Sequence, residues 1–158
     1  MKAGNKILWM ILVTALAGIV FGAPSVFAGE GRKAILSVVR GSVQVHVQGE
    51  RDWKPARAGM ILSEKDEIQT AKDGLVEIFL DEGGSVGKLR LSERSRLNLL
   101  TMDIDTESGD KVTLLELAVG KVLVEVEKLK GESKFEVKTP TSTAGVQGTV
   151  FEVAVELR

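Results

Sequence analysis

The chain has 158 residues, a formal net charge of −1 and no cysteine. Its length predicts one domain with a modest core. The near balance of charges leaves no concentrated basic surface, so we expect no nucleic-acid partner. The lack of cysteine excludes disulfides, thiolate metal ligands and a cysteine nucleophile within this chain.

The N-terminal segment has the three parts of a secretory signal peptide. Lys2 and Lys6 give it a basic start, and an uncharged apolar run follows over residues 7–23. Small residues then stand at the −3 and −1 positions of a cleavage site between Ala28 and Gly29.

These features predict two parts, a signal peptide over residues 1–28 and an exported domain over residues 29–158. The alternative is an uncleaved membrane anchor, but the apolar run falls short of the ~20 residues that span a bilayer comfortably. In both cases we expect the domain to be periplasmic or secreted. Only an uncleaved signal would hold it at the membrane.

The exported part alternates Val, Ile and Leu with polar residues in short runs, a pattern typical of half-buried strands. Three runs begin with a glycine, at Gly41, Gly74 and Gly120, and a fourth copy after Gly148 is shifted by one residue. Such a shift is what a β-bulge would produce. Lys111–Leu117 lacks a helical apolar period and also favours a strand.

We therefore predict an all-β fold of roughly ten or more short strands. A compact β-roll or solenoid-like stack of short strands accounts best for the recurring glycine units. A two-sheet β-sandwich is the alternative.

Several segments occur in an order that resembles the periplasmic domain of the FecR family. They are Trp53–Ala56, Gly59–Leu62, Asp66–Thr70, Gly74–Leu80, Gly84–Val86, Ser95–Leu97, Leu117–Val122 and Val137–Val153. The most specific of them is Thr-Pro-Thr…Ala-Gly-Val-x-Gly-Thr-x-Phe, which runs from Thr139 to Phe151. The resemblance covers nearly the whole exported part.

The resemblance implies a role in signalling. Family members with full architecture carry an iron-siderophore signal from an outer-membrane receptor to a cytoplasmic anti-sigma segment. Only Met1–Lys6 precede the apolar run here, so we expect a stand-alone domain without the anti-sigma segment. Such domains often have Arg before the second glycine of the motif, where this chain has Gln147.

The motif also supplies the first candidate site residues, which are Thr139, Thr141, Ser142, Thr143 and Gln147. Their hydroxyl and amide groups can satisfy an irregular backbone at a corner between strands. The same groups could instead line a groove for a ligand or partner. Trp53 is a further candidate, either as an exposed anchor for a partner or as part of the core.

Asp103, Asp105, Glu107 and Asp110 place four carboxylates in one short segment, and oxygen ligands at such spacing suit Ca²⁺. The segment does not follow the EF-hand pattern, so an acidic, solvated hairpin is the simpler interpretation. We expect no cofactor.

Gly83–Gly87 matches the string of a nucleophile elbow around Ser85, and His46 is the only histidine. The elbow requires a strand-to-helix turn, whereas this string joins two predicted strands. His46 has opposite parity to Val43 and Val45, so we expect it to face solvent. We therefore predict that the protein is not an enzyme.

The interpretation that remains is an exported binding or sensory module with a part in iron-linked signalling. Its expected partner is another envelope protein or a cell-wall component. The alternative is a structural or assembly factor that acts by pairing at strand edges.

Overall fold

The computed structural model describes residues 31–81 and 86–156. The predicted signal peptide, its cleavage site and Ser85 of the elbow-like string lie outside these ranges. Among the described residues, no helix is long and apolar enough to cross a membrane.

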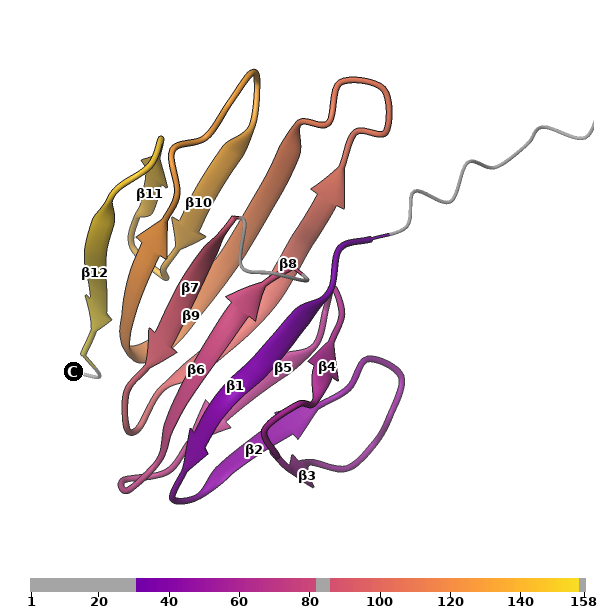
Figure 1. Ribbon diagram of the computed structural model, residues 1–158. Helices are drawn as coiled ribbons and strands as arrows, with labels where there is room; N and C mark the ends of the chain where they lie inside the picture. The colour runs from indigo at the N-terminus through magenta and orange to yellow at the C-terminus, as the bar shows by residue number, and fades with distance from the viewer. Residues whose placement is uncertain (1–30, 82–85, 157–158) are drawn as a thin grey trace, which may run out of the picture.

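The described part of the chain consists of strands and the turns between them, which confirms the predicted all-β class. The strands are β1 (Ala34–Arg40), β2 (Val43–His46), β3 (Lys54–Pro55), β4 (Ile61–Leu62), β5 (Glu67–Thr70), β6 (Leu75–Leu80), β7 (Gly87–Leu91), β8 (Arg96–Ile104), β9 (Lys111–Val126), β10 (Lys134–Lys138), β11 (Thr143–Val146) and β12 (Val150–Val155). Together they form one curled sheet that folds into two facing layers (Figure 1).

We call the two layers A and B. Layer A runs in the order β4, β1, β6, β7, second half of β9, β12, and all its pairs are antiparallel. Layer B runs in the order β3, β2, β5, β8, first half of β9, β10, β11, and only β9 and β10 pair in parallel. The long strand β9 therefore belongs to both layers and joins them.

Gly120 makes the bend of β9 possible. Its φ of +94° lies in the left-handed region, and a Cβ there would stand 2.5 Å from the Cα of Ser95. Only glycine tolerates both conditions without strain. The neighbouring Lys121 N–H donates to the Ser95 hydroxyl at 2.9 Å, which fixes the bend against the corner between β7 and β8.

The three glycines that begin the predicted repeat units all lie at corners where the chain passes between the layers. Gly41 precedes β2, Gly74 precedes β6, and Gly120 bends β9. Successive corners are hydrogen-bonded to one another: Ala71 N–H donates to the Ser42 carbonyl at 2.9 Å. The predicted stack of similar units is thus confirmed, and its strands also form the two facing layers of the alternative.

The fourth copy behaves differently, and the predicted β-bulge after Gly148 is wrong. β12 pairs with β9 in unbroken register from Val150 to Val155. Gly148 instead lies in the turn between β11 and β12 with a φ of +100°. The alternation of apolar residues shifts by one after Gly148 because the chain passes there from β11 in layer B to β12 in layer A.

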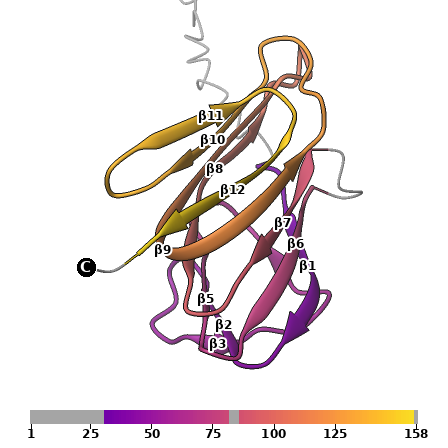
Figure 2. The same cartoon turned by 90° about the vertical axis from the view of Figure 1, so that its left-hand side faces the viewer.

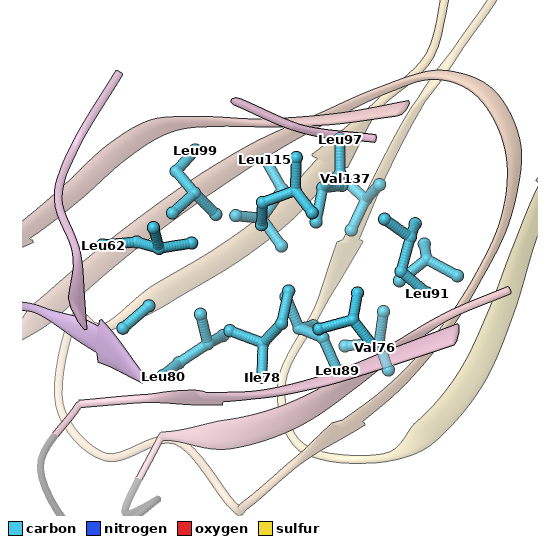
Figure 3. Packing of buried hydrophobic residues seen from close by; sticks show 14 of the residues in the cluster. Leu62, Val76, Ile78, Leu80, Leu89, Leu91, Leu97, Leu99, Leu115 and Val137 are labelled. Atoms are coloured by element: carbon cyan, nitrogen blue, oxygen red, sulfur yellow. The ribbon is translucent and has the colours of Figure 1, made fainter. Parts of the chain in front are cut away.

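The core fills the space between the layers (Figure 3). Alternation along each strand sends every second side chain inward, so β6 buries Val76, Ile78 and Leu80. Further fully buried residues are Leu36 and Leu89 in layer A and Leu97, Leu99, Leu115 and Val137 in layer B. Each such side chain contributes roughly 1.5–3 kcal/mol by its removal from water.

Candidate functional site

Trp53 lies on the outer face of layer B, half-buried just before β3. The His46 ring packs against it with 5.4 Å between ring centroids and a tilt of 43°. The guanidinium carbon of Arg96 lies 5.7 Å from the Trp53 ring centroid, within cation–π range. The indole is therefore held between two side chains that come from β2 and β8.

A row of planar polar side chains continues from this indole across the strands. Arg96 donates to the Gln69 amide oxygen at 3.0 Å, and Gln69 donates to the Gln44 amide oxygen at 2.7 Å. The Arg96 guanidinium also pairs with the Glu67 carboxylate at 3.3 Å. These contacts follow the register of β2, β5 and β8, in which Gln44, Gln69 and Arg96 lie side by side.

A second row runs parallel to the first. His46, Glu67, Asn98 and Glu116 are cross-strand neighbours on β2, β5, β8 and β9. The Asn98 amide donates to the Glu116 carboxylate at 3.0 Å. The two rows form what we call the layer B patch, which consists of Gln44, His46, Trp53, Glu67, Gln69, Arg96, Asn98 and Glu116.

Of this patch, the sequence alone proposed only Trp53 as a binding residue, and it placed His46 on the solvent-facing side of its strand. The other members stand at the solvent-facing positions of separate strands, and register brings them together. Their parity, opposite to that of the buried valines, was the signal available in the sequence. His46 follows this signal, because it lies on the outer face of layer B beside Trp53.

The threonine-rich segment forms the turn between β10 and β11. The Thr139 hydroxyl accepts the Ser142 N–H at 3.0 Å and lies 3.1 Å from the Ser142 carbonyl oxygen, which it can donate to. Thr139 is buried, whereas Thr141, Ser142 and Thr143 are exposed. The Thr139 hydroxyl thus serves the turn itself, which matches the corner interpretation.

Gln147 is exposed in the segment that follows β11. It lines a shallow depression of about 410 Å³ together with Phe135, Glu136 and Gly145. β10 and β11 lie at the opposite end of layer B from β3. The structure therefore does not bring Gln147 and the threonines together with Trp53.

The four acidic residues lie in and around the turn between β8 and β9. The Asp105 carboxylate accepts the N–H groups of Ser108 at 2.8 Å and Glu107 at 2.9 Å. These two backbone donors, Ser108 first, lower the pKa of Asp105 below its ordinary value. Asp110 accepts the Glu132 N–H at 3.1 Å.

Asp103 accepts the N–H of Ile104 at 2.8 Å. Asp103, Asp105 and Asp110 thus each accept a backbone N–H, as expected for an acidic turn. Across residues 31–81 and 86–156, no group of three or more His, Cys, Asp or Glu side chains could hold a metal ion.

Arg32 anchors the segment that precedes β1 to the end of β8 and the start of β9. Its Nε donates to the Asp103 carbonyl at 3.0 Å and its Nη2 to the Val112 carbonyl at 3.0 Å, with a further hydrogen bond to the Thr113 hydroxyl. Burial lowers the pKa of this guanidinium, while the nearby Asp81 and Asp103 raise it. The side chain fixes the point at which the N-terminal segment enters the fold.

A second depression, of about 630 Å³, lies at the stacked corners and was not indicated by the sequence. It is lined by Ser92, Glu93, Arg94, Val119, Gly120, Lys121, Ala154, Val155 and Glu156. Its two acidic and two basic side chains give it no dominant charge. The depression exists because β12 ends beside the bend of β9.

The facing layers, the shared bent strand and the glycine corners define an all-β domain of stacked strand units. A family model described as FecR protein matches residues 66–157. The match covers more than half of the chain, and the chain belongs to the FecR family. No curated protein and no solved structure matches it significantly.

Family membership confirms the resemblance found in the sequence. The matched range contains the strands from β5 to β12 and the whole Thr139–Phe151 segment. Trp53 and β1 to β4 precede it. FecR domains are typically periplasmic, and the family is regulatory, so membership indicates a sensory or signalling module.

Proposed function

We propose that the protein is an exported, non-enzymatic sensory module of the bacterial envelope that acts by binding another envelope protein. Membership of a regulatory family supports this role. The layer B patch supplies the surface for it, and the observation that carries the proposal is the packing of Trp53 between His46 and Arg96.

The composition of the patch favours a protein partner. Trp and Arg are enriched among the residues that dominate binding energy at protein interfaces. Here both are already ordered by contacts within the domain, so binding immobilises fewer free side chains. The amides of Gln69, which accepts from Arg96, and of Gln44 add polar groups to the same surface.

Site-specific crosslinking in cells tests the proposal. A photoreactive residue replaces Gln44 in the layer B patch, and a matched one replaces Lys88 on the outer face of layer A. We expect an adduct with an envelope protein from position 44, and its loss when Trp53→Ala is added. Equal labelling from both positions, or none from position 44, would contradict the proposal.

A cell-wall component is the other partner class that this experiment identifies. In that case the adduct at position 44 would sediment with isolated cell wall and contain no second protein. That outcome would replace the protein partner by a wall polymer.

The proposal includes a link to iron, which rests on the family alone. If the link holds, the partner is a receptor for iron complexes, and the crosslink increases when cells are deprived of iron. A crosslink of unchanged intensity with and without iron would remove the iron link and leave the binding role.

Strand-edge pairing is the second candidate function, and a specific observation favours it. In the part of the chain that the structure describes, β11 pairs only with β10, and β12 pairs only with β9. Each therefore presents one free edge, at which a further strand can add.

A further inference from the structure

The two ends of the strand stack are built differently. At one end, β3 and β4 contain two residues each, and β3 includes Pro55, which has no N–H to offer. The segment between them starts on layer B, where Ala56 N–H donates to the Val43 carbonyl of β2, and reaches layer A, where Gly59 N–H donates to the Leu36 carbonyl of β1. Short edges, a proline and a covering segment protect this end from pairing.

Among the residues that the structure describes, the opposite end has none of these protections. β11 and β12 contain four and six residues, and neither includes a proline or a lysine. Their inward side chains, which include Val146, Phe151, Val153 and Val155, are only half-buried against the core. Figure 2 looks onto this end and shows β11 and β12 as its outermost strands.

The end is also stepped. Counted from β9, which both layers share, layer B extends by two strands (β10 and β11) and layer A by one (β12). β9 reverses its direction at Gly120 as it passes between the layers. β11 and β12 consequently run in opposite directions, as their arrows in Figure 1 show.

We propose that a second copy of this chain packs on this end, so that β12 of each copy pairs antiparallel with β11 of the other. The inference rests on the second candidate function, strand-edge pairing, and names its partner. A twofold axis parallel to the strands preserves strand direction and exchanges the layers. It therefore brings β12 against the oppositely directed β11 twice, in the self-complementary manner of a twofold dimer.

The step fits this arrangement. In each layer of the dimer, β10 and β11 of one copy meet β12 of the other. The protruding β11 therefore fills the space beside layer A of the second copy, which extends only one strand beyond β9. The inward side chains of β11 (Ala144 and Val146) then adjoin those of β12 (Phe151 and Val153). The two half-covered ends become one continuous core.

Charge favours pairing of unlike strands. β11 carries no charged side chain, so Glu152 of β12 meets no like charge across the contact. Pairing of β12 with its own copy about Val153 would bring two Glu152 carboxylates into diagonal positions, ~7–8 Å apart. Like charges in neighbouring cross-strand positions are unfavourable.

The hydrogen-bond pattern identifies the backbone groups that face the second copy. Val126 N–H donates to the Thr149 carbonyl, so by antiparallel alternation the N–H groups of Glu152 and Ala154 point away from β9. The bond from Thr139 N–H to the Ser142 carbonyl likewise directs the Gly145 N–H away from β10.

Two proline variants test the arrangement, because proline removes only the outward N–H at these positions. Sedimentation velocity of the purified protein is expected to give twice the mass of one chain, and Ala154→Pro and Gly145→Pro are each expected to give monomer. The matched controls Ala154→Ser and Gly145→Ala keep the N–H and are expected to remain dimers. A Cβ at Gly145 meets its nearest neighbour at 3.7 Å, an ordinary contact.

Thiol crosslinking gives a second readout that does not depend on proline. The chain has no cysteine, so added cysteines are its only thiols. A short bifunctional thiol reagent is expected to join Glu152→Cys chains to Thr143→Cys chains in a mixture, and to join neither variant to itself.

A monomeric wild-type protein at every concentration overturns the inference. Dimers that survive Gly145→Pro but not Ala154→Pro, or self-crosslinking of Glu152→Cys, would also overturn it, because both indicate pairing of β12 with β12. The crosslink from position 44 reports the proposed binding function separately, on a face that the dimer leaves free.

Discussion

Single glycines fix the corners of this fold, and Gly120 is one of them that combines a left-handed φ with a close approach to another corner. We expect Gly120→Ala to lower the free energy of unfolding by about 2 kcal/mol or more, because it adds left-handed strain and a clash with Ser95. Urea unfolding followed by circular dichroism measures this loss. Gly49→Ala is the control: its φ is +84° and nothing lies within 4 Å of the added Cβ. Equal losses in both variants would show that the clash contributes nothing.

Asp66 makes a second contribution at the scale of one residue. It is only 2% exposed, and its carboxylate accepts the N–H groups of Gln48 at 2.9 Å and Ser63 at 2.8 Å. Asp66→Asn replaces one acceptor oxygen by a donor that faces an N–H. We expect a loss of about 1–3 kcal/mol in the free energy of unfolding, measured by urea denaturation.

The control for this prediction is Asp52→Asn, at an exposed position before β3, which should change stability by less than ~0.5 kcal/mol. An unchanged unfolding midpoint for Asp66→Asn would mean that the two N–H groups find other partners.

The alternation of residue types predicted which side chains are buried, but it did not predict which outward-facing side chains contact one another. Val43 and Val45 are buried as their alternation indicated. The contacts of Trp53 could not be predicted, because they depend on the pairing of β2 with β3 and of β5 with β8. Side chains that are distant in sequence meet only when the register is known.

At the scale of elements, the hairpin of β10 and β11 depends on one hydroxyl. Thr139→Val keeps the shape of the side chain but removes the oxygen that accepts the Ser142 N–H. We expect a loss of about 1–2 kcal/mol in stability and faster amide hydrogen exchange in β11. Thr141→Val, at an exposed position of the same turn, is the control. Unchanged exchange in Thr139→Val would show that Pro140 and the strand pairing suffice.

The sequence pattern predicted where a strand lies, but pairing with neighbouring strands determines where β9 ends. Lys111–Leu117 is a strand as predicted, but it continues through Gly120 as part of β9. The recurring pattern of a glycine followed by alternating valines predicted that a separate strand begins at Gly120. The strand continues because β8 and β10 flank its first half, while β7 and β12 flank its second half.

For the whole molecule, the shared strand has an energetic consequence. A side chain in the first half of β9, such as Leu115, packs between layers that its own strand connects. Neither layer can therefore lose its core contacts without exposing apolar surface of the other. The recurring glycines predicted a stack of units, but not that one strand would make the two layers interdependent.

We accordingly expect the domain to unfold in one cooperative transition. Leu89→Ala, a fully buried position of layer A, should lower stability by about 2–5 kcal/mol. In a Trp9→Phe background, Trp53 fluorescence reports layer B, and circular dichroism reports all strands. If β9 couples the layers, Leu89→Ala shifts both midpoints equally, because coincident transitions mark two-state unfolding. The neighbouring Lys88→Ala removes only a surface ion pair with Glu125 and should shift neither by more than ~0.5 kcal/mol. A fluorescence midpoint that stays in place while the dichroism midpoint falls would show that layer B unfolds independently, and the coupling through β9 would then be wrong.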